Sequence, residues 1–494
     1  MLTAVVVGAG FSGIAAGVAL KRAGITDFVI LEKADRVGGT WRENTYPGAA
    51  CDVPSHLYSF SFEPNPKWSR AYGEQREILA YLEHCADKYG LRPHLKFGHA
   101  VAEARFDRDR WHVTTQTGER FEARALLLGN GALHLPSLPD IPGLASFEGT
   151  QFHSARWNHD YDLRGKRVAA IGTGASAIQF VPRIAPDVKE LHVFQRTAAW
   201  VVPKQDREIT AREQWAFEHV PGAHWLRRTS QYWRMESSVI GFAYAPKVLA
   251  LAEKLVTRHI AKQVTDPVLR RKLTPTYRLG CKRVLISNEW YPAMQRENVE
   301  LVTDGIAEIT PRGVRTVDGR ERQVDALILG TGFKVSEYLS SIRVLGSGAI
   351  DLNDEWRRGL RNYLGITVSG FPNLFLLMGP NTGLGHNSMI FMIEAQARYA
   401  AQALAAMRDQ RVAAIDVRPE VESAFRTDLA RKMKNTVWMT GCQSWYQTPD
   451  GEVFLWPAAT IDYWWKTRRV DLGQYALTPA DTQLARSRRA RDAA

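Results

Sequence analysis

Two glycine-rich segments constrain the fold of this chain more than any other feature of its 494 residues. The first is Gly8-Ala9-Gly10-Phe11-Ser12-Gly13, and the second is Gly172-Thr173-Gly174-Ala175-Ser176-Ala177. Each follows an apolar, β-branched run and precedes a stretch with helical spacing. A strand, a glycine turn and a helix in this order let the backbone approach a pyrophosphate at a helix N-terminus. The pattern predicts an α/β protein with two Rossmann-like dinucleotide-binding domains.

The residue at the tip of the following strand differs between the two segments. Glu32 stands nineteen residues after Gly13, and Arg196 stands nineteen residues after Ala177. An acid at this place accepts hydrogen bonds from a ribose 2′-hydroxyl, whereas an arginine suits a 2′-phosphate. We therefore expect the first segment to bind FAD or NAD and the second to bind NADPH. A protein that holds two such nucleotides transfers electrons.

Turn residues and changes in periodicity divide the chain into three parts. A stretch rich in Trp, Arg and Leu has helical spacing and shows no strand signals, so it is predicted to be a helical insertion. We expect its apolar stripe to pack in the core, with a cover for a substrate or a membrane-facing surface as the alternatives. The predicted parts are a discontinuous FAD-binding domain (1–141 and 336–494), an NADPH-binding domain (150–209 and 274–333) and the insertion (210–273).

Composition indicates a soluble globular protein, with 45% hydrophobic and 23% charged residues. We find no apolar run as long as a membrane span. The first strand-like run begins at residue 3, which leaves no room for a signal peptide, so we expect a cytoplasmic protein. The net charge of +12 is scattered except for four arginines between 486 and 491, which we interpret as a solvated terminus. No nucleic-acid partner is expected.

The cysteines are Cys51, Cys85, Cys281 and Cys442. None lies close enough to another in sequence to form a redox pair or a zinc knuckle. This spacing counts against a flavin disulfide reductase, which needs neighbouring thiols, and against a structural metal site.

Three further motifs resemble those of a known family. Phe147-x-Gly149-x-x-x-His153-x-x-x-Trp157 resembles the signature of class B flavoprotein monooxygenases, and of type I Baeyer–Villiger monooxygenases in particular. The stretch from Gly39-Thr40-Trp41 to Asp52 resembles the second Baeyer–Villiger motif, and Gly280-Cys281-Lys282-Arg283 resembles the segment that carries a cofactor-binding lysine and the catalytic arginine. The resemblance covers nearly the whole chain. One departure is Asn158, where the family commonly has Pro or Asp.

The resemblance implies an FAD-dependent, NADPH-consuming enzyme. It would insert one oxygen atom from O2 next to a ketone carbonyl, through a flavin C4a-peroxide, and release an ester or lactone. Arg283 is implied to be catalytic because a guanidinium stays cationic and can hold a peroxy anion. Asp52 is implied to set the position and field of that arginine. Without the resemblance, Arg283 is an ordinary surface arginine and Asp52 a turn former.

The same reasoning assigns the cofactor-binding residues. For FAD they are Gly8, Gly10, Phe11, Ser12, Gly13, Glu32, Lys33, Gly39, Thr40, Trp41 and Asp52, and for NADPH they are Gly172, Thr173, Gly174, Ser176, Ala177, Arg196, Thr197 and Lys282. His153 is interpreted as an organiser of the junction between the nucleotide domains. Trp438, Trp445 and Trp456 either wall the substrate pocket or pack in the core, and the loop 435–446 is expected to close over the substrate.

Three alternatives remain open. An S- or N-oxygenating flavin monooxygenase needs no peroxy anion, and such enzymes typically lack the equivalents of Asp52 and Arg283. An NADPH oxidase or reductase would pass its electrons on without oxygenating a ketone. A nucleotide-sensing protein would bind both cofactors without turnover. The expected partners are a small ketone and O2, and the expected state is a monomer or weak homodimer without stable membrane insertion.

Overall fold

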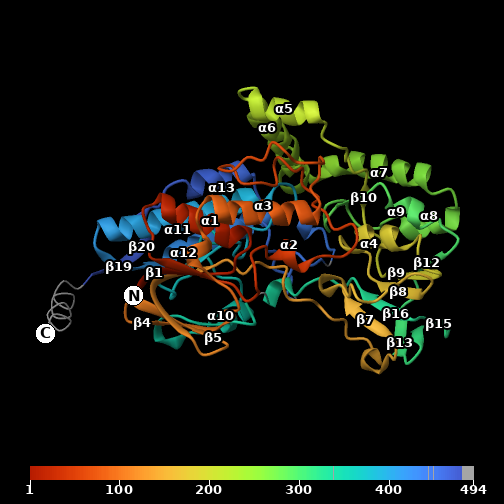
Figure 1. The fold of residues 1–494 in the computed structure, drawn as a ribbon, viewed down its shortest axis with the longest axis horizontal. Helices are drawn as coiled ribbons and strands as arrows, with labels where there is room; N and C mark the ends of the chain where they lie inside the picture. Colours follow the sequence, from red (N-terminus) through yellow and green to blue (C-terminus); the bar gives the residue numbers. More distant parts are fainter. Residues whose placement is uncertain (338, 443, 449, 481–494) are drawn as a thin grey trace.

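The structure is a computed structural model that describes residues 1–337, 339–442, 444–448 and 450–480. The arginines at 486–491, interpreted above as a solvated terminus, lie outside these residues. Two sheets with largely parallel pairing form the body of the molecule, and helices cover them (Figure 1). The α/β fold class with two Rossmann-like units and a helical insertion is confirmed.

The first sheet has β1 at its centre, paired in parallel with β2 and β6. Its order is β17-β4-β5-β6-β1-β2-β3, and β18 pairs in parallel with β6. The antiparallel pairs β4–β5 and β5–β6 extend one side of it. The strands are β1 (Leu2–Val7), β2 (Phe28–Leu31), β3 (Leu95–Lys96), β4 (Val101–Asp107), β5 (Arg110–Thr115), β6 (Arg120–Leu128), β17 (Arg343–Leu345) and β18 (Leu374–Leu376).

Side chains of the central strands alternate between two cores because successive residues of a strand point to opposite faces. Ala4 and Val6 pack with the helices α1 (Phe11–Arg22), α3 (Gln75–Lys88) and α11 (Met389–Asp409). Val5 and Val7 pack on the other face, with Trp111 among others. Burial on both faces explains why β1 and β2 are continuous apolar runs. The pairing of β18 and the packing of α11 return the C-terminal part of the chain to this sheet.

The second sheet is parallel throughout, in the order β12-β9-β8-β16-β7. The helix α4 (Ala177–Ile184) packs on one face, and an antiparallel ribbon of β13, β14 and β15 packs on the other. The elements are β7 (Thr150–His153), β8 (Arg167–Ile171), β9 (Glu190–Phe194), β12 (Val299–Val302), β13 (Ile306–Thr310), β14 (Gly313–Thr316), β15 (Glu321–Gln323) and β16 (Ala326–Leu329).

The stretch between β10 (Val201–Val202) and β11 (Leu285–Ile286) is helical. Two of its helices, α5 and α6, project from one edge of the molecule, and α7 lies along the same edge (Figure 1). Its helices are α5 (Ala211–His219), α6 (Ala223–Glu236), the π-helical turn η4 (Ile240–Tyr244), η5 (Pro246–Val248), α7 (Leu249–Gln263) and α8 (Pro267–Leu273). Our expectation that its apolar stripe packs in the core is wrong for several large side chains, because Trp225, Trp233 and Leu251 are exposed.

The other α-helices and strands complete the layers around the two sheets. They are α2 (Thr40–Glu43), α9 (Trp290–Ala293), α10 (Leu352–Arg357), α12 (Pro419–Met433), α13 (Thr460–Thr467), β19 (Val412–Val417) and β20 (Tyr475–Pro479). Among the described residues, a helix with the length and apolar character of a transmembrane span is absent.

Candidate active site

The first glycine turn joins β1 to α1 under strong steric constraint. Gly8 has a φ of +93°, and a Cβ on Gly13 would lie 1.9 Å from the carbonyl oxygen of Gly8. Gly10 is the N-cap residue of α1 and has no side chain to cap the helix, so the first amides of the helix are left for a ligand. Gly39, with a φ of +53°, packs against Gly10. These features fit the close approach of a pyrophosphate.

Glu32 is buried at the end of β2 and is held by the glycine turn itself. Its Oε2 accepts a hydrogen bond from the Ala9 amide at 2.8 Å, and its Oε1 accepts one from the Ala34 amide at 3.0 Å. The Arg42 guanidinium lies 3.0 Å from Oε1. A carboxylate offers about four acceptor positions, so Glu32 keeps capacity for a ribose hydroxyl. The sequence reasoning did not identify Arg42.

The other residues assigned to the first nucleotide lie around this turn. Phe11 and Ser12 are buried at the start of α1, and the Phe11 ring lies 5.2 Å from that of Tyr58. Trp41, in the short helix that begins at Thr40, donates a hydrogen bond from Nε1 to the Tyr58 hydroxyl at 3.2 Å. Lys33 lies further out, with its Nζ 3.7 Å from Glu43.

The second glycine turn joins β8 to α4. Gly172 has a φ of +106°, and a Cβ there would lie 2.4 Å from the carbonyl oxygen of Gly330. Ala177 is buried at the start of α4, also beside Gly330. A Cβ on Gly174 would meet nothing within 4 Å. The protein's own packing therefore does not demand glycine at 174, and the open space fits a phosphate group.

Two cations lie close together beside this turn. Arg196 is exposed just beyond β9, and Lys282 is half-buried with its Nζ 4.9 Å from the Tyr277 ring centre. Burial, and then the positive charge of Arg196, lower the pKa of Lys282. Thr173 donates a hydrogen bond to the Thr197 carbonyl at 3.4 Å. Two clustered cations at a strand end suit an anion with the charge of a 2′-phosphate.

The loop that follows Trp41 reaches across to α4. The Tyr46 hydroxyl donates to the Gln179 side chain at 2.9 Å, and Gln179 donates to the Ala50 carbonyl at 3.0 Å. Ser176 also lies beside the Tyr46 hydroxyl. The segment that carries Asp52 is therefore anchored to the second glycine turn's helix, a connection that the sequence spacing did not reveal.

Asp52 and Arg283 form a direct ion pair although 231 residues separate them. The Arg283 Nε and Nη2 donate to Asp52 Oδ2 at 2.9 and 2.5 Å. The carboxylate raises the pKa of Arg283, which keeps the guanidinium charged. The two side chains keep 29% and 26% of their surfaces exposed, so a ligand can still reach them. The sequence reasoning left open whether the two residues touch, and the structure brings them together.

Tyr446 is a third member of this cluster. It is buried, and burial raises the pKa of its phenol, while the neighbouring Arg283 guanidinium opposes part of that rise. The sequence reasoning placed Tyr446 in a loop over the substrate and gave it no role. Its distance in sequence from Arg283 carries no signal of the contact.

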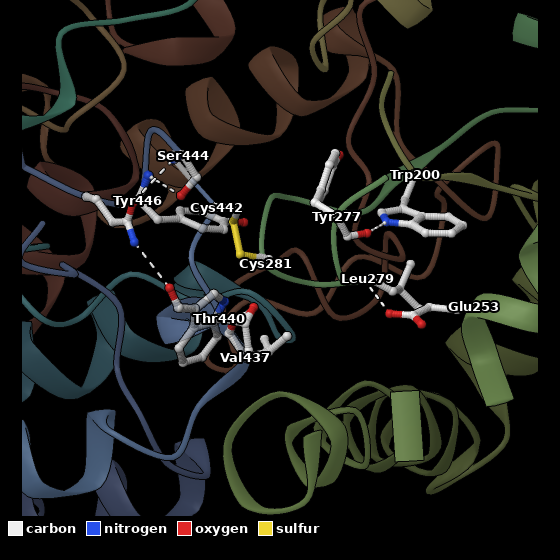
Figure 2. Close-up of a disulfide and its surroundings, with 12 residues drawn as sticks. Trp200, Glu253, Tyr277, Leu279, Cys281, Val437, Thr440, Cys442, Ser444 and Tyr446 are labelled. Carbon is white, nitrogen blue, oxygen red and sulfur yellow. Dashed lines mark hydrogen bonds between the residues drawn. A yellow bond between two sulfur atoms is a disulfide. The ribbon is translucent and has the colours of Figure 1, made fainter. Parts of the chain in front are cut away.

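Cys281 and Cys442 form a disulfide, with their Cα atoms 6.2 Å apart and a sequence separation of 161 (Figure 2). The cysteine spacing excluded only pairs that are close in sequence, so this bond was missed. It ties the segment before Lys282 and Arg283 to the loop that contains Tyr446. Two residues before Cys281, the amide of Leu279 donates to Glu253 Oε1 at 2.9 Å. After Arg283, the Leu285 amide of β11 donates to the Trp200 carbonyl at 2.8 Å, so the chain is held on both sides of Arg283.

The Phe147–Trp157 motif spans β7 and the residues on both sides of it. His153 is buried, its Nδ1 accepts from the Ala155 amide at 3.1 Å, and burial lowers its pKa. Its ring lies 6.0 Å from Phe333, in the segment that leaves the second sheet. The Asn158 side chain accepts from the Asp160 amide at 3.1 Å, so the departure from the family pattern still forms a turn.

The three C-terminal tryptophans differ in burial. Trp438 and Trp456 are among the fully buried side chains. Trp438 packs in the core shared by α4 and the second sheet, and Trp456 packs in a smaller cluster. Trp445 is partly exposed beside Tyr446. Packing accounts for the first two, which leaves Trp445 as the candidate for contact with a ligand.

Comparisons with known proteins agree with this arrangement. A family model described as pyridine nucleotide-disulphide oxidoreductase matches residues 5–215. The chain is 46% identical to a Baeyer–Villiger monooxygenase of Pseudomonas aeruginosa, over 96% of this chain and 91% of that protein. It is 47% identical to a Baeyer–Villiger monooxygenase of Streptomyces coelicolor, over 97% and 93%.

Solved structures of two enzymes resemble the whole chain. A steroid monooxygenase bound to NADP has a TM-score of 0.88 at 30% identity, over 97% of this chain and 99% of that one. Cyclohexanone monooxygenase from Rhodococcus sp. Phi1 bound to NADP+ has a TM-score of 0.88 at 31% identity, over the same shares.

The two glycine turns and the shared fold define the class of flavoprotein monooxygenases. Within that class, the chain belongs to the Baeyer–Villiger monooxygenase family, and it is an enzyme.

Proposed function

We propose that this chain binds FAD at the first glycine turn and NADPH at the second, and that it converts a small ketone to an ester or lactone with one oxygen atom from O2. The observation that carries the proposal is the Asp52–Arg283 ion pair. Asp52 lies on the loop that follows Trp41, and Gln179 of α4 anchors that loop. When bound, FAD supplies the activation of oxygen and NADPH supplies the hydride.

We assign the nucleotide contacts by charge and steric access. Glu32 accepts from the ribose of FAD, and the amides at Gly10 to Gly13 face its pyrophosphate. Arg196 and Lys282 hold the 2′-phosphate of NADPH, and the open space at Gly174 admits the pyrophosphate. This division of the contacts supports the proposed domain boundaries. They are 1–141 with 336–494 for the FAD-binding domain, 150–209 with 274–333 for the NADPH-binding domain, and 210–273 for the insertion.

Arg283 is the proposed catalytic residue. Its guanidinium stabilises negative charge on the oxygen that attacks the ketone carbonyl. At ~4 Å and an effective dielectric constant of about 20, one such charge pair is worth roughly 4 kcal/mol, which corresponds to about a thousandfold in rate. Asp52 acts as a positioning residue, because it fixes the guanidinium through the Nε and Nη2 hydrogen bonds. His153, whose pKa is lowered by burial, organises the junction beside Phe333.

The direct test is a panel of cyclic and linear ketones incubated with the purified holoenzyme, NADPH and air. We expect products heavier than the ketone by one oxygen atom, with the mass spectra of esters or lactones. Consumption of NADPH and oxygen that ends in hydrogen peroxide with every ketone would instead support an oxidase. Oxygenation of sulfides or amines alone would support the S- or N-oxygenating alternative.

We further propose that the protein acts in the cytoplasm as a monomer or weak homodimer. Disulfides are rare in reducing compartments, so the oxidation state of Cys281 and Cys442 in protein isolated under thiol-blocking conditions bears on this location. Cell fractionation and sedimentation velocity test the two statements separately.

A further inference from the structure

The helical insertion presents an exposed apolar stripe to solvent. Leu226, Trp233, Ile240 and Tyr244 are 63%, 55%, 53% and 56% exposed. They recur at intervals of seven, seven and four residues along the nearly continuous helical run of α6 and η4, which places them on one helix face. The exposed serines Ser230 and Ser237 lie between them on this face. Soluble proteins expose single apolar side chains as a rule, whereas several large ones on one face indicate a surface that binds something.

The next helix continues the stripe and adds positive charge. Val248, Leu251 and Leu255 are exposed at helical spacing, and Lys254, Arg258 and Lys262 are exposed along the same helix. Glu253, the acidic residue of α7, is turned toward the body, where it accepts from the Leu279 amide and pairs with Arg278. The outward face of α7 is therefore apolar and basic.

Charge is concentrated in this part of the chain. Residues 210–273 contain eleven lysines and arginines against five acids, so the insertion carries +6 of the total net charge of +12. Trp215 of α5 and Trp225 of α6 are also exposed. The helices that bear these residues lie along one edge of the molecule, where α5 and α6 project outward (Figure 1).

The apolar side chains and the positive charge together favour one of the partners that could cover the stripe. Helices with large apolar side chains, aromatic rings and Lys or Arg on their outward face lie in the interface of anionic membranes. Trp and Tyr favour that interface because each ring has an apolar body and a polar atom. A second copy of the chain would bring two insertions of +6 against each other, and this repulsion disfavours self-association through the same face.

We propose that the insertion 210–273 docks the enzyme peripherally on an anionic lipid bilayer. The apolar stripe (Leu226, Trp233, Ile240, Tyr244, Val248, Leu251 and Leu255) enters the headgroup region, and Lys254, Arg258 and Lys262 contact the acidic lipid headgroups. The absence of a membrane-spanning helix from the described residues is consistent with surface binding, which requires none.

The test is sedimentation of the full-length holoenzyme with vesicles of phosphatidylcholine alone, or with about 30% phosphatidylglycerol. We expect binding to the anionic vesicles that weakens as salt rises, because part of the attraction is electrostatic. The variant Leu226→Ser/Trp233→Ser should bind at least about tenfold more weakly, because it removes apolar surface from the docking face. Lys254→Glu/Arg258→Glu should reduce binding to the anionic vesicles specifically.

Matched controls use residues of similar exposure outside the insertion. Leu138→Ser/Val317→Ser removes two apolar side chains that are 63% and 70% exposed, and Arg357→Glu/Arg358→Glu reverses two exposed charges at the C-terminal end of α10. Both should bind vesicles like the wild type. Absence of wild-type binding, or equal losses in test and control variants, would overturn the proposal. So would a concentration-dependent dimer that Leu226→Ser/Trp233→Ser dissociates, without any vesicle binding. Retained FAD absorbance and melting temperature establish that each variant is folded.

Discussion

The two glycine turns have the same backbone plan and opposite electrostatics. In both, a glycine with positive φ packs against the carbonyl of a neighbouring strand end. At the first turn, the strand-end acid Glu32 is buried and bound by backbone amides and Arg42. At the second, the strand-end Arg196 is exposed beside Lys282. The first site is thus prearranged by the protein, whereas the second keeps unneutralised charge that a ligand would satisfy.

The largest difference between the turns concerns the steric role of their glycines. Gly13→Ala places a Cβ 1.9 Å from the Gly8 oxygen, so we expect loss of bound FAD and destabilisation by about 3 kcal/mol or more. Gly174→Ala meets open space, so its stability should stay within about 0.5 kcal/mol of the wild type, with weaker NADPH use. Urea unfolding and flavin absorbance measure the contrast. Equal destabilisation by both substitutions would contradict it.

The charge of the second turn should set the preference for NADPH. Arg196→Ala/Lys282→Ala removes two cations, and we expect the KM for NADPH to rise about a hundredfold, or roughly 2.7 kcal/mol. The KM for NADH should change little, because NADH lacks the 2′-phosphate. Lys189→Ala, which removes an exposed lysine at the opposite end of β9, serves as the control. An equal rise in KM for both nucleotides would show that these residues do not recognise the 2′-phosphate.

The same pair predicts a pH dependence. Burial and the charge of Arg196 lower the pKa of Lys282, so the lysine loses its proton at a lower pH than an ordinary lysine. The KM for NADPH should therefore rise several-fold as the pH increases toward the usual lysine range. Lys282→Arg remains charged throughout and should flatten the profile. An unchanged profile in that variant would assign the effect to another group.

The smallest expected effect comes from the disulfide, which supports the segment of Lys282 and Arg283 and not the first glycine turn. Cys442→Ser frees one flank of the segment before Lys282, while the Leu279–Glu253 and Asp52–Arg283 contacts remain. We expect kcat/KM to fall about two- to threefold, or roughly 0.5 kcal/mol, with FAD content unchanged. Wild-type enzyme treated with a reductant should behave in the same way. A loss of FAD in this variant would show that the bond supports the first site instead.

Sequence periodicity and motif spacing predicted the fold class and the two strand–turn–helix units, because these depend on local apolar runs and on glycines. The family resemblance, rather than spacing, predicted that Asp52 and Arg283 act together, and the structure shows that they form an ion pair. The contacts of Tyr446, Gln179 and the disulfide join residues that are distant in sequence, and no local pattern encodes them. The exposure of Trp233 and its neighbours was missed because helical periodicity defines a stripe without stating what covers it.

The central claim is that the Arg283 guanidinium, held by Asp52, makes ketone oxygenation possible. The measurement is the rate of ester or lactone formation by Arg283→Ala, with FAD content and NADPH oxidation recorded on the same sample. Arg278→Ala, which removes a neighbouring arginine paired with Glu253, is the control. We predict that Arg283→Ala retains FAD and loses about a thousandfold of product formation, while Arg278→Ala stays close to the wild type. Ester formation at the wild-type rate by Arg283→Ala would contradict the account.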